Sequence, residues 1–97
     1  MNMQSMLKQA QNMQNKMMKA QEEVNSKKFF GESSYVKVEY VGGNVTSIKI
    51  NTDCIEKDDI EMLEDMLVVA ISNAKSQYDK EMEEKLGAYT KGIPGLF

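Results

Sequence analysis

The sequence predicts an α+β fold in which a three-stranded antiparallel sheet is flanked by two long helices, in the order α-β-β-β-α. Apolar residues recur at helical spacing in residues 1–25 and 58–90, and they alternate with period two in the segment 28–51. The 97 residues form a single domain, 1–97, whose core is thin for a monomer. We therefore expect a homodimer, because association buries apolar surface that one copy leaves exposed.

The first helix is expected over residues 1–25 and should end where Asn25-Ser26 breaks the apolar pattern. Its apolar residues are alternately three and four positions apart, which aligns them along one side of a helix. This apolar stripe consists of Met3, Met6, Ala10, Met13, Met17, Ala20 and Val24. From Met6 onward we expect it to be a packing seam, either against a partner copy or against the protomer's own sheet.

The rest of the first helix is neutral or basic, with no acidic residue before Glu22. A solvated helix usually interleaves both signs of charge, because oppositely charged neighbours stabilise it. Here Lys8, Lys16 and Lys19 stand among amides, although the net charge of the protein is −3. Two interpretations are open. The helix is either an ordinary packing helix whose wet face lacks acids, or it offers ammonium and amide groups to a polyanion.

The middle of the chain predicts three strands joined by two tight turns. The strands are expected at 28–32, 35–41 and 45–51, with turns at Ser33-Ser34 and at Gly42-Gly43-Asn44. The alternation places Val36, Val38 and Tyr40 on one face of the second strand, and Thr46, Ile48 and Ile50 on one face of the third. One apolar face of this sheet therefore needs a helix over it.

The second long helix is expected over 58–90, capped by Asp58 or Asp59, with a broad apolar face suited to the sheet. The residues 91–97 contain Gly92 and Pro94 and should form an apolar tail, either docked or frayed. Charge is uneven along the chain. Residues 1–28 carry five lysines against two glutamates, whereas residues 53–97 carry eleven acids against five lysines.

The residues that most catalytic sites require are missing. There is no histidine, and the single cysteine, Cys54, lies among acidic residues that disfavour its thiolate. The acidic run 53–65 lacks the glycine turn and ligand spacing of a calcium loop. We therefore expect no enzyme activity, no cofactor or metal, and no small-molecule substrate. A single cysteine cannot form an intrachain disulfide, so we expect a protein of the reducing cytoplasm. No segment has the length and hydropathy of a membrane span, so we expect no membrane partner.

Three stretches, in order along the whole chain, resemble the YbaB/EbfC family of bacterial nucleoid-associated proteins. The first is residues 6–14 followed by 20–23, and the second runs from Gly31-Glu32-Ser33 through 36–38 and the glycine hairpin to 48–50. The third comprises residues 61–67, Asn73-Ala74 and the closing Pro94-Gly95-Leu96-Phe97. The resemblance implies a tight homodimer whose first and last helices extend as arms, located in the nucleoid. It also implies binding of double-stranded DNA with little sequence preference, affecting nucleoid organisation or gene expression.

The sequence also departs from the family pattern. Phe29-Phe30 is bulkier than the usual first strand, the usual glycine-rich turn is shortened to Ser34, and no arginine follows Asn73-Ala74. Transferred to the residues present here, the resemblance implies DNA contacts at Lys8, Gln11, Asn15, Lys16, Lys19, Lys75 and Lys80.

Arginine is absent and there are 12 lysines, so any DNA contact should hold phosphates better than it reads bases. The competing interpretation is a protein–protein adaptor. In that case the methionine-rich first helix would dock with a helix of another protein.

Overall fold

The structure is a computed structural model that describes residues 2–90. Its elements are α1 (Met3–Ser26), β1 (Lys28–Ser33), β2 (Val36–Val41), β3 (Asn44–Ile50) and α2 (Ile60–Thr90). Two 3₁₀ turns, η1 (Thr52–Cys54) and η2 (Lys57–Asp59), join β3 to α2. This order confirms the predicted α-β-β-β-α architecture. The predicted tail at 91–97 lies outside the described residues.

Helix α1 begins and ends close to its predicted limits because polar side chains satisfy its terminal backbone groups. At its start, the Asn2 side chain accepts a hydrogen bond of 2.9 Å from the Ser5 backbone N–H. At its end, the Ser26 hydroxyl donates to the Glu22 carbonyl, and Lys27 adopts an extended backbone that leads directly into β1. The chain therefore passes from helix to sheet without a loop.

The three strands form an antiparallel sheet in the order β1-β2-β3, joined by two-residue turns. Gly42 and Gly43 form the second turn with φ angles of 61° and 88°, which only glycine adopts readily. The first turn is Ser34-Tyr35, one residue later than predicted, because Ser33 still pairs with Val36 in the β1–β2 ladder.

A β-bulge interrupts the ladder between β2 and β3. Tyr40 pairs with Val45 and Glu39 pairs with Ser47, which leaves Thr46 as an extra residue. The prediction that Thr46 shares a face with Ile48 and Ile50 is therefore wrong. The Thr46 hydroxyl instead donates to the Glu39 carboxylate at 2.8 Å, on the opposite face of the sheet.

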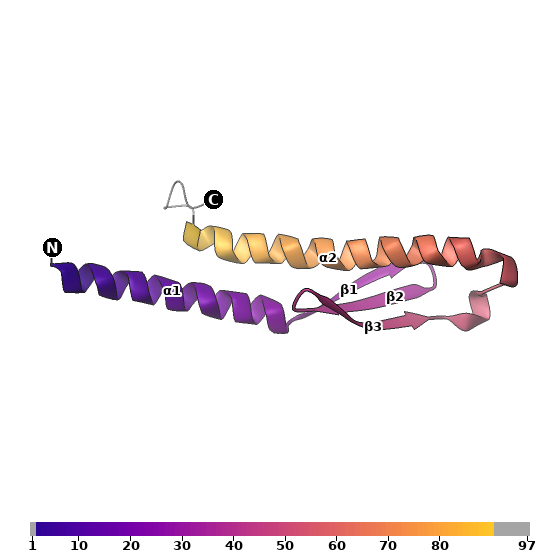
Figure 1. Ribbon diagram of the computed structural model, residues 1–97, viewed down its shortest axis with the longest axis horizontal. Coiled ribbons are helices and arrows are strands. Elements are labelled where there is room, and N and C mark those ends of the chain that lie inside the picture. The colour runs from indigo at the N-terminus through magenta and orange to yellow at the C-terminus, as the bar shows by residue number, and fades with distance from the viewer. Residues whose placement is uncertain (1, 91–97) are drawn as a thin grey trace.

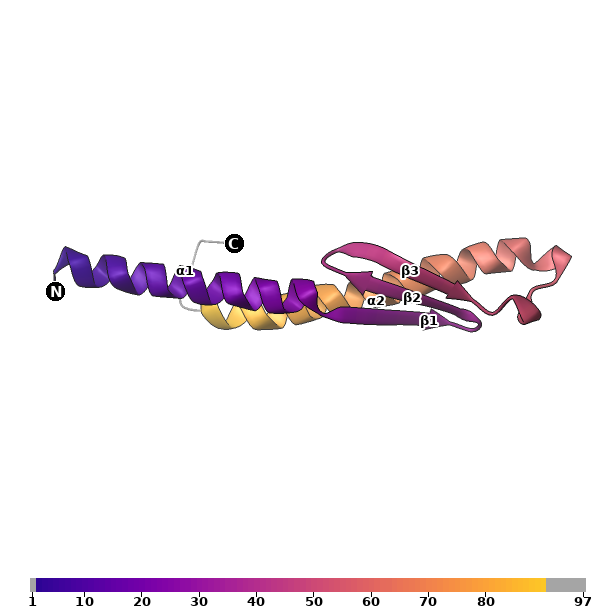
Figure 2. The same ribbon diagram turned by 90° about the horizontal axis from the view of Figure 1, so that it is seen from below.

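Helix α2 crosses the inner face of the sheet at an angle to the strands, lying mainly over β1 and β2 (Figures 1 and 2). It begins two residues later than predicted, because η2 occupies the first residues of the expected helix. The buried side chains beneath α2 form two groups. One comprises Val36, Val38 and Ala70, and the other comprises Val24, Phe29, Tyr40 and Ala74.

The edge strand β1 is held to α2 by two side-chain amides. Asn73 donates to the Glu32 carbonyl at 3.4 Å, and Gln77 donates to the Phe30 carbonyl at 2.8 Å. These bonds satisfy carbonyls that an edge strand otherwise presents to solvent. Because these bonds hold α2 along β1, the helix covers β1 and β2 and leaves much of β3 uncovered.

The molecule is elongated, with extents of 71 × 23 × 13 Å. Beyond the sheet, the C-terminal half of α2 runs antiparallel to α1, and the N-terminal part of α1 extends past the described end of α2 (Figure 1). The two helices therefore form an arm that projects from the sheet.

Candidate nucleic-acid interface

The predicted contact residues of α1 all lie on one side of the arm. At about 100° per residue, Gln11, Asn15, Lys8, Lys19 and Lys16 span about 140° of the helix circumference. All five are exposed, and the buried end of the apolar stripe, at Ala20 and Val24, lies outside this arc. We call these five residues the arm face. It presents three ammonium groups spread over about 16 Å of helix length.

The lysines of the arm face have no internal counter-charge. Among residues 2–90, Lys8, Lys16 and Lys19 form no ion pair, whereas five other lysines each lie within 3.8 Å of a carboxylate. The nearest acids on α1 come only at Glu22 and Glu23, and Glu23 lies 3.7 Å from Lys85 of α2. The arm face is therefore available to an external anion.

The two predicted contact residues of α2 are placed differently. Lys75 forms an i,i+4 ion pair with Asp79, and the pKa of Lys75 is raised by that hydrogen bond and by the charge of Asp79. Lys80 is five positions further along, so it points about 140° away from Lys75 around the helix. The structure therefore does not bring these two lysines together, and it gives one of them an internal partner.

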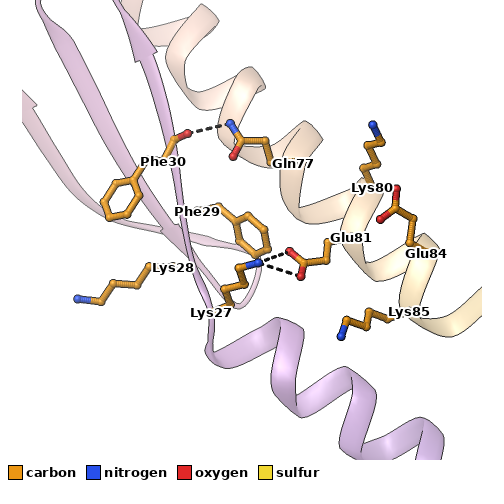
Figure 3. A pocket seen from close by; sticks show the side chains of 9 residues that line it. All are labelled: Lys27, Lys28, Phe29, Phe30, Gln77, Lys80, Glu81, Glu84 and Lys85. Carbon is orange, nitrogen blue, oxygen red and sulfur yellow. Dashed lines mark hydrogen bonds and ion pairs between the residues drawn. The ribbon is translucent and has the colours of Figure 1, made fainter.

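A basic groove lies where α1 passes into β1, under the C-terminal half of α2 (Figure 3). It is open, with a volume of about 690 Å³. Four lysines and two glutamates line it: Lys27, Lys28, Lys80, Lys85, Glu81 and Glu84. Lys27 donates to both oxygens of the Glu81 carboxylate at 2.9 Å, which joins α1 to α2. Sequence reasoning missed Lys27 and Lys85, because no local pattern connects residues more than 50 positions apart.

The apolar stripe of α1 is divided into two parts. At its C-terminal end, Ala20 and Val24 are buried, with Val24 in the core cluster beneath α2, and Met17 is partly buried. At its N-terminal end, Met6, Ala10 and Met13 are exposed in the protomer. Only the last two turns of the stripe therefore pack within one copy.

A second uncovered apolar surface adjoins β3. Val45 and Ile48 lie on the inner face of β3 and are exposed, because α2 covers mainly β1 and β2. Ile60 and Val68 are exposed on α2, and at about 100° per residue they lie about 120° and about 160° around the helix from the midpoint of Asn73 and Gln77. We call these four residues the β3 flank.

In the part of the chain that the structure describes, no cluster of three or more His, Cys, Asp or Glu side chains has an arrangement suited to a metal ion. No helix there has the length and apolar character that crossing a membrane requires.

A three-stranded antiparallel sheet between two long helices that project together as an arm defines a small α+β protein of α-β-β-β-α order. The model of the YbaB/EbfC DNA-binding family matches residues 1–93, and the chain belongs to this family.

Three similar relatives are each described as a nucleoid-associated protein. One from Lactococcus lactis subsp. cremoris (strain MG1363) is 46% identical over 97% of this chain and 98% of its own. One from Ligilactobacillus salivarius (strain UCC118) is 41% identical over 99% of this chain and 95% of its own. One from Enterococcus faecalis (strain ATCC 700802 / V583) is 41% identical over 98% of this chain and 94% of its own.

Proposed function

We propose that this protein is a nucleoid-associated protein that binds double-stranded DNA as a homodimer, mainly through lysine–phosphate contacts. The observation that carries the proposal is the arm face, where Lys8, Lys16 and Lys19 are exposed and unpaired among the described residues. Membership of a DNA-binding family and the names of the relatives support it.

The chemistry of the arm face favours backbone contacts over base reading. Lysine is a compact point charge, and only arginine supplies the planar fork that reads guanine bidentately. The chain has no arginine. The amides of Gln11 and Asn15 can donate to phosphates or reach base edges, but they are too few to specify a sequence. The protein should therefore bind unrelated duplexes with similar affinity.

Dimerisation would place two arms on one DNA molecule. The β3 flank is the surface we propose for it, because β3 and α2 each contribute two apolar side chains to it that one copy leaves exposed. Val68 is 64% exposed in the protomer, so burial against a second copy would remove it from water. The N-terminal half of the apolar stripe is the other candidate for the dimer contact.

Salt titration of duplex binding tests the arm face. If about four phosphates are neutralised, log K should fall with log salt at a slope of roughly −3.6. The combined variant Lys8→Gln/Lys16→Gln/Lys19→Gln should flatten this slope and weaken binding about equally on two unrelated duplexes. A matched control, Lys28→Gln/Lys57→Gln/Lys85→Gln, removes the same charge at three lysines to which no DNA contact is assigned. Equal losses in both variants, or no loss in the arm variant, would exclude the arm face as the principal contact.

Sedimentation at micromolar concentration tests the dimer. The parent should sediment at about twice the protomer mass of 11.0 kDa. Val68→Glu introduces a charge at a position already exposed in the protomer, so it should separate the copies and leave the fold intact. The control Val69→Glu changes the adjacent valine, which is 47% exposed and lies outside the β3 flank. A dimeric Val68→Glu protein with a monomeric Met13→Glu protein would assign the interface to the apolar stripe instead.

The adaptor function remains as a second candidate because Met3, Met6 and Leu7 are exposed at the end of the arm. A flexible methionine surface suits the docking of another helix. An arm variant that binds duplex DNA as tightly as the parent, with the same salt slope, would favour the adaptor function for α1.

A further inference from the structure

The outer face of the sheet, opposite α2, carries an exposed aromatic ring. Phe30 is 43% exposed, whereas its neighbour Phe29 is buried beneath α2. A phenylalanine in the first strand would usually be expected to contribute to a core. Here the alternation of β1 directs Phe30 outward, in register with Glu39 of β2.

One lysine lies against this ring. The Lys37 ammonium lies 4.8 Å from the centre of the Phe30 ring. Lys49 of β3 is directly opposite Lys37 in the ladder, and like charges in that position destabilise a sheet unless something neutralises them. Within residues 2–90, Lys49 forms no ion pair. Two lysines therefore stand at paired positions of neighbouring strands, and one of them, Lys49, has no ion-pair partner among the described residues.

The ring and the lysines enclose a small recess. It measures about 100 Å³ and is lined by Phe30, Lys37, Glu39, Ser47 and Lys49. The Glu39 carboxylate accepts a hydrogen bond from Thr46 and lies 3.5 Å from the Lys28 ammonium. The Glu39 carboxylate still lines the recess and opposes a bound anion there, and Glu32 lies 3.8 Å from Lys37.

We propose that this outer face binds single-stranded DNA, with an unpaired base stacked on Phe30 and backbone phosphates held by Lys37 and Lys49. Every base has an apolar face that an aromatic ring can stack against, and lysines beside the ring complement the phosphates of the same strand. A duplex hides its base faces, so stacking on Phe30 requires an unpaired base. This site is separate from the arm face and does not depend on it.

A tryptophan reporter tests the stacking directly. The chain contains no tryptophan, so Phe30→Trp introduces a single fluorophore at the proposed site. Titration with oligothymidylate should quench its fluorescence in a saturable manner. The control Met62→Trp places the fluorophore at an exposed position of α2, outside this face, and its emission should stay constant. Equal quenching of both reporters, or of neither, would overturn the proposal.

Affinity measurements separate the two sites. In the Lys8→Gln/Lys16→Gln/Lys19→Gln background, Phe30→Ala should weaken oligothymidylate binding about tenfold, in line with the loss of one stacked base. Lys49→Gln should also weaken it, and Glu39→Gln should strengthen it by removing a carboxylate from the recess. In the parent background, Phe30→Ala should leave duplex binding unchanged.

Each outcome can be attributed to one site. Loss of duplex binding only in the arm variant, with no effect of Phe30→Ala on oligothymidylate, would overturn the sheet site and leave the proposed function intact. If Phe30→Ala weakens oligothymidylate binding while the arm variant binds duplex DNA as the parent does, the proposed function is overturned and the single-stranded DNA site stands. Tighter binding of oligouridylate than of oligothymidylate through Phe30 would overturn the assignment to DNA.

Discussion

Gly31 of β1 and Ala70 of α2 touch through their backbones. A Cβ atom added at Gly31 would lie 1.9 Å from the Ala70 carbonyl oxygen and 2.7 Å from the Ala74 amide nitrogen. Ala70 and Ala74 are fully buried, so small residues on both elements let the helix approach the edge strand closely. This contact fixes the distance from which Asn73 and Gln77 reach the β1 carbonyls.

Replacing Gly31 by alanine should therefore destabilise the protein strongly. The new methyl group would collide with the backbone of α2, which cannot move without breaking the hydrogen bonds from Asn73 and Gln77 to β1. We therefore expect the free energy of unfolding to fall by about 3 kcal/mol or more. Urea denaturation followed by circular dichroism measures it. Gly87→Ala is the control, because nothing lies within 4 Å of its added Cβ and alanine favours a helix. Similar midpoints for both variants would show that α2 can shift away from β1.

Tyr78 should contribute more through its ring than through its hydroxyl. The ring makes edge contacts with Phe29 and Tyr40, with centres 5.9 and 5.5 Å away, and the hydroxyl donates to the Asn25 side chain at the end of α1. Tyr78→Phe should cost about 1 kcal/mol and Tyr78→Ala roughly 3 kcal/mol of unfolding free energy. Equal losses in the two variants would mean that the ring contacts add nothing.

The pKa of the Glu39 carboxyl should depend on the β-bulge, because the bulge residue Thr46 donates a hydrogen bond to that carboxylate. The Thr46 hydroxyl, and then the Lys28 ammonium, lower the Glu39 pKa below its ordinary value of 4.5. Because the folded state favours the ionised carboxylate, this stabilisation is present above the ordinary pKa and is lost as pH falls through the lowered one. Thr46→Ala should raise the Glu39 pKa in a carboxyl NMR titration, while Ser47→Ala should leave it unchanged. An unaltered pKa in Thr46→Ala would assign the shift to the lysines.

Cys54 should be replaceable. It lies in the turn η1, and its neighbours in sequence are acidic residues that disfavour a thiolate. We expect Cys54→Ser to sediment and to bind duplex DNA as the parent does. A large loss of DNA binding with unchanged sedimentation would instead reveal a functional thiol.

Much of the fold was predictable because it depends on local patterns. The spacing of apolar residues predicted both helices, and Gly42-Gly43 predicted a hairpin turn that the structure confirms. The bulge at Thr46 was not predictable, because one extra residue in a strand leaves the alternation on either side intact. The positions of the arm lysines on one side of α1 also follow from helical geometry alone.

The sequence by itself determined the composition of each surface. Its basic residues are lysines and not arginines, no acidic residue comes before Glu22, and α1 carries an apolar stripe. Only the tertiary structure decided which of these groups are free. Lys75 and Lys27 are neutralised by carboxylates, one a helical turn away and the other 54 residues away, while Lys8, Lys16 and Lys19 have no such partner among the described residues. Phe29 and Phe30 are adjacent in sequence, yet one is buried under α2 and the other faces solvent. The physical reason is that burial and ion pairing depend on which element lies opposite a side chain, and the contact between Gly31 and Ala70 sets where α2 lies.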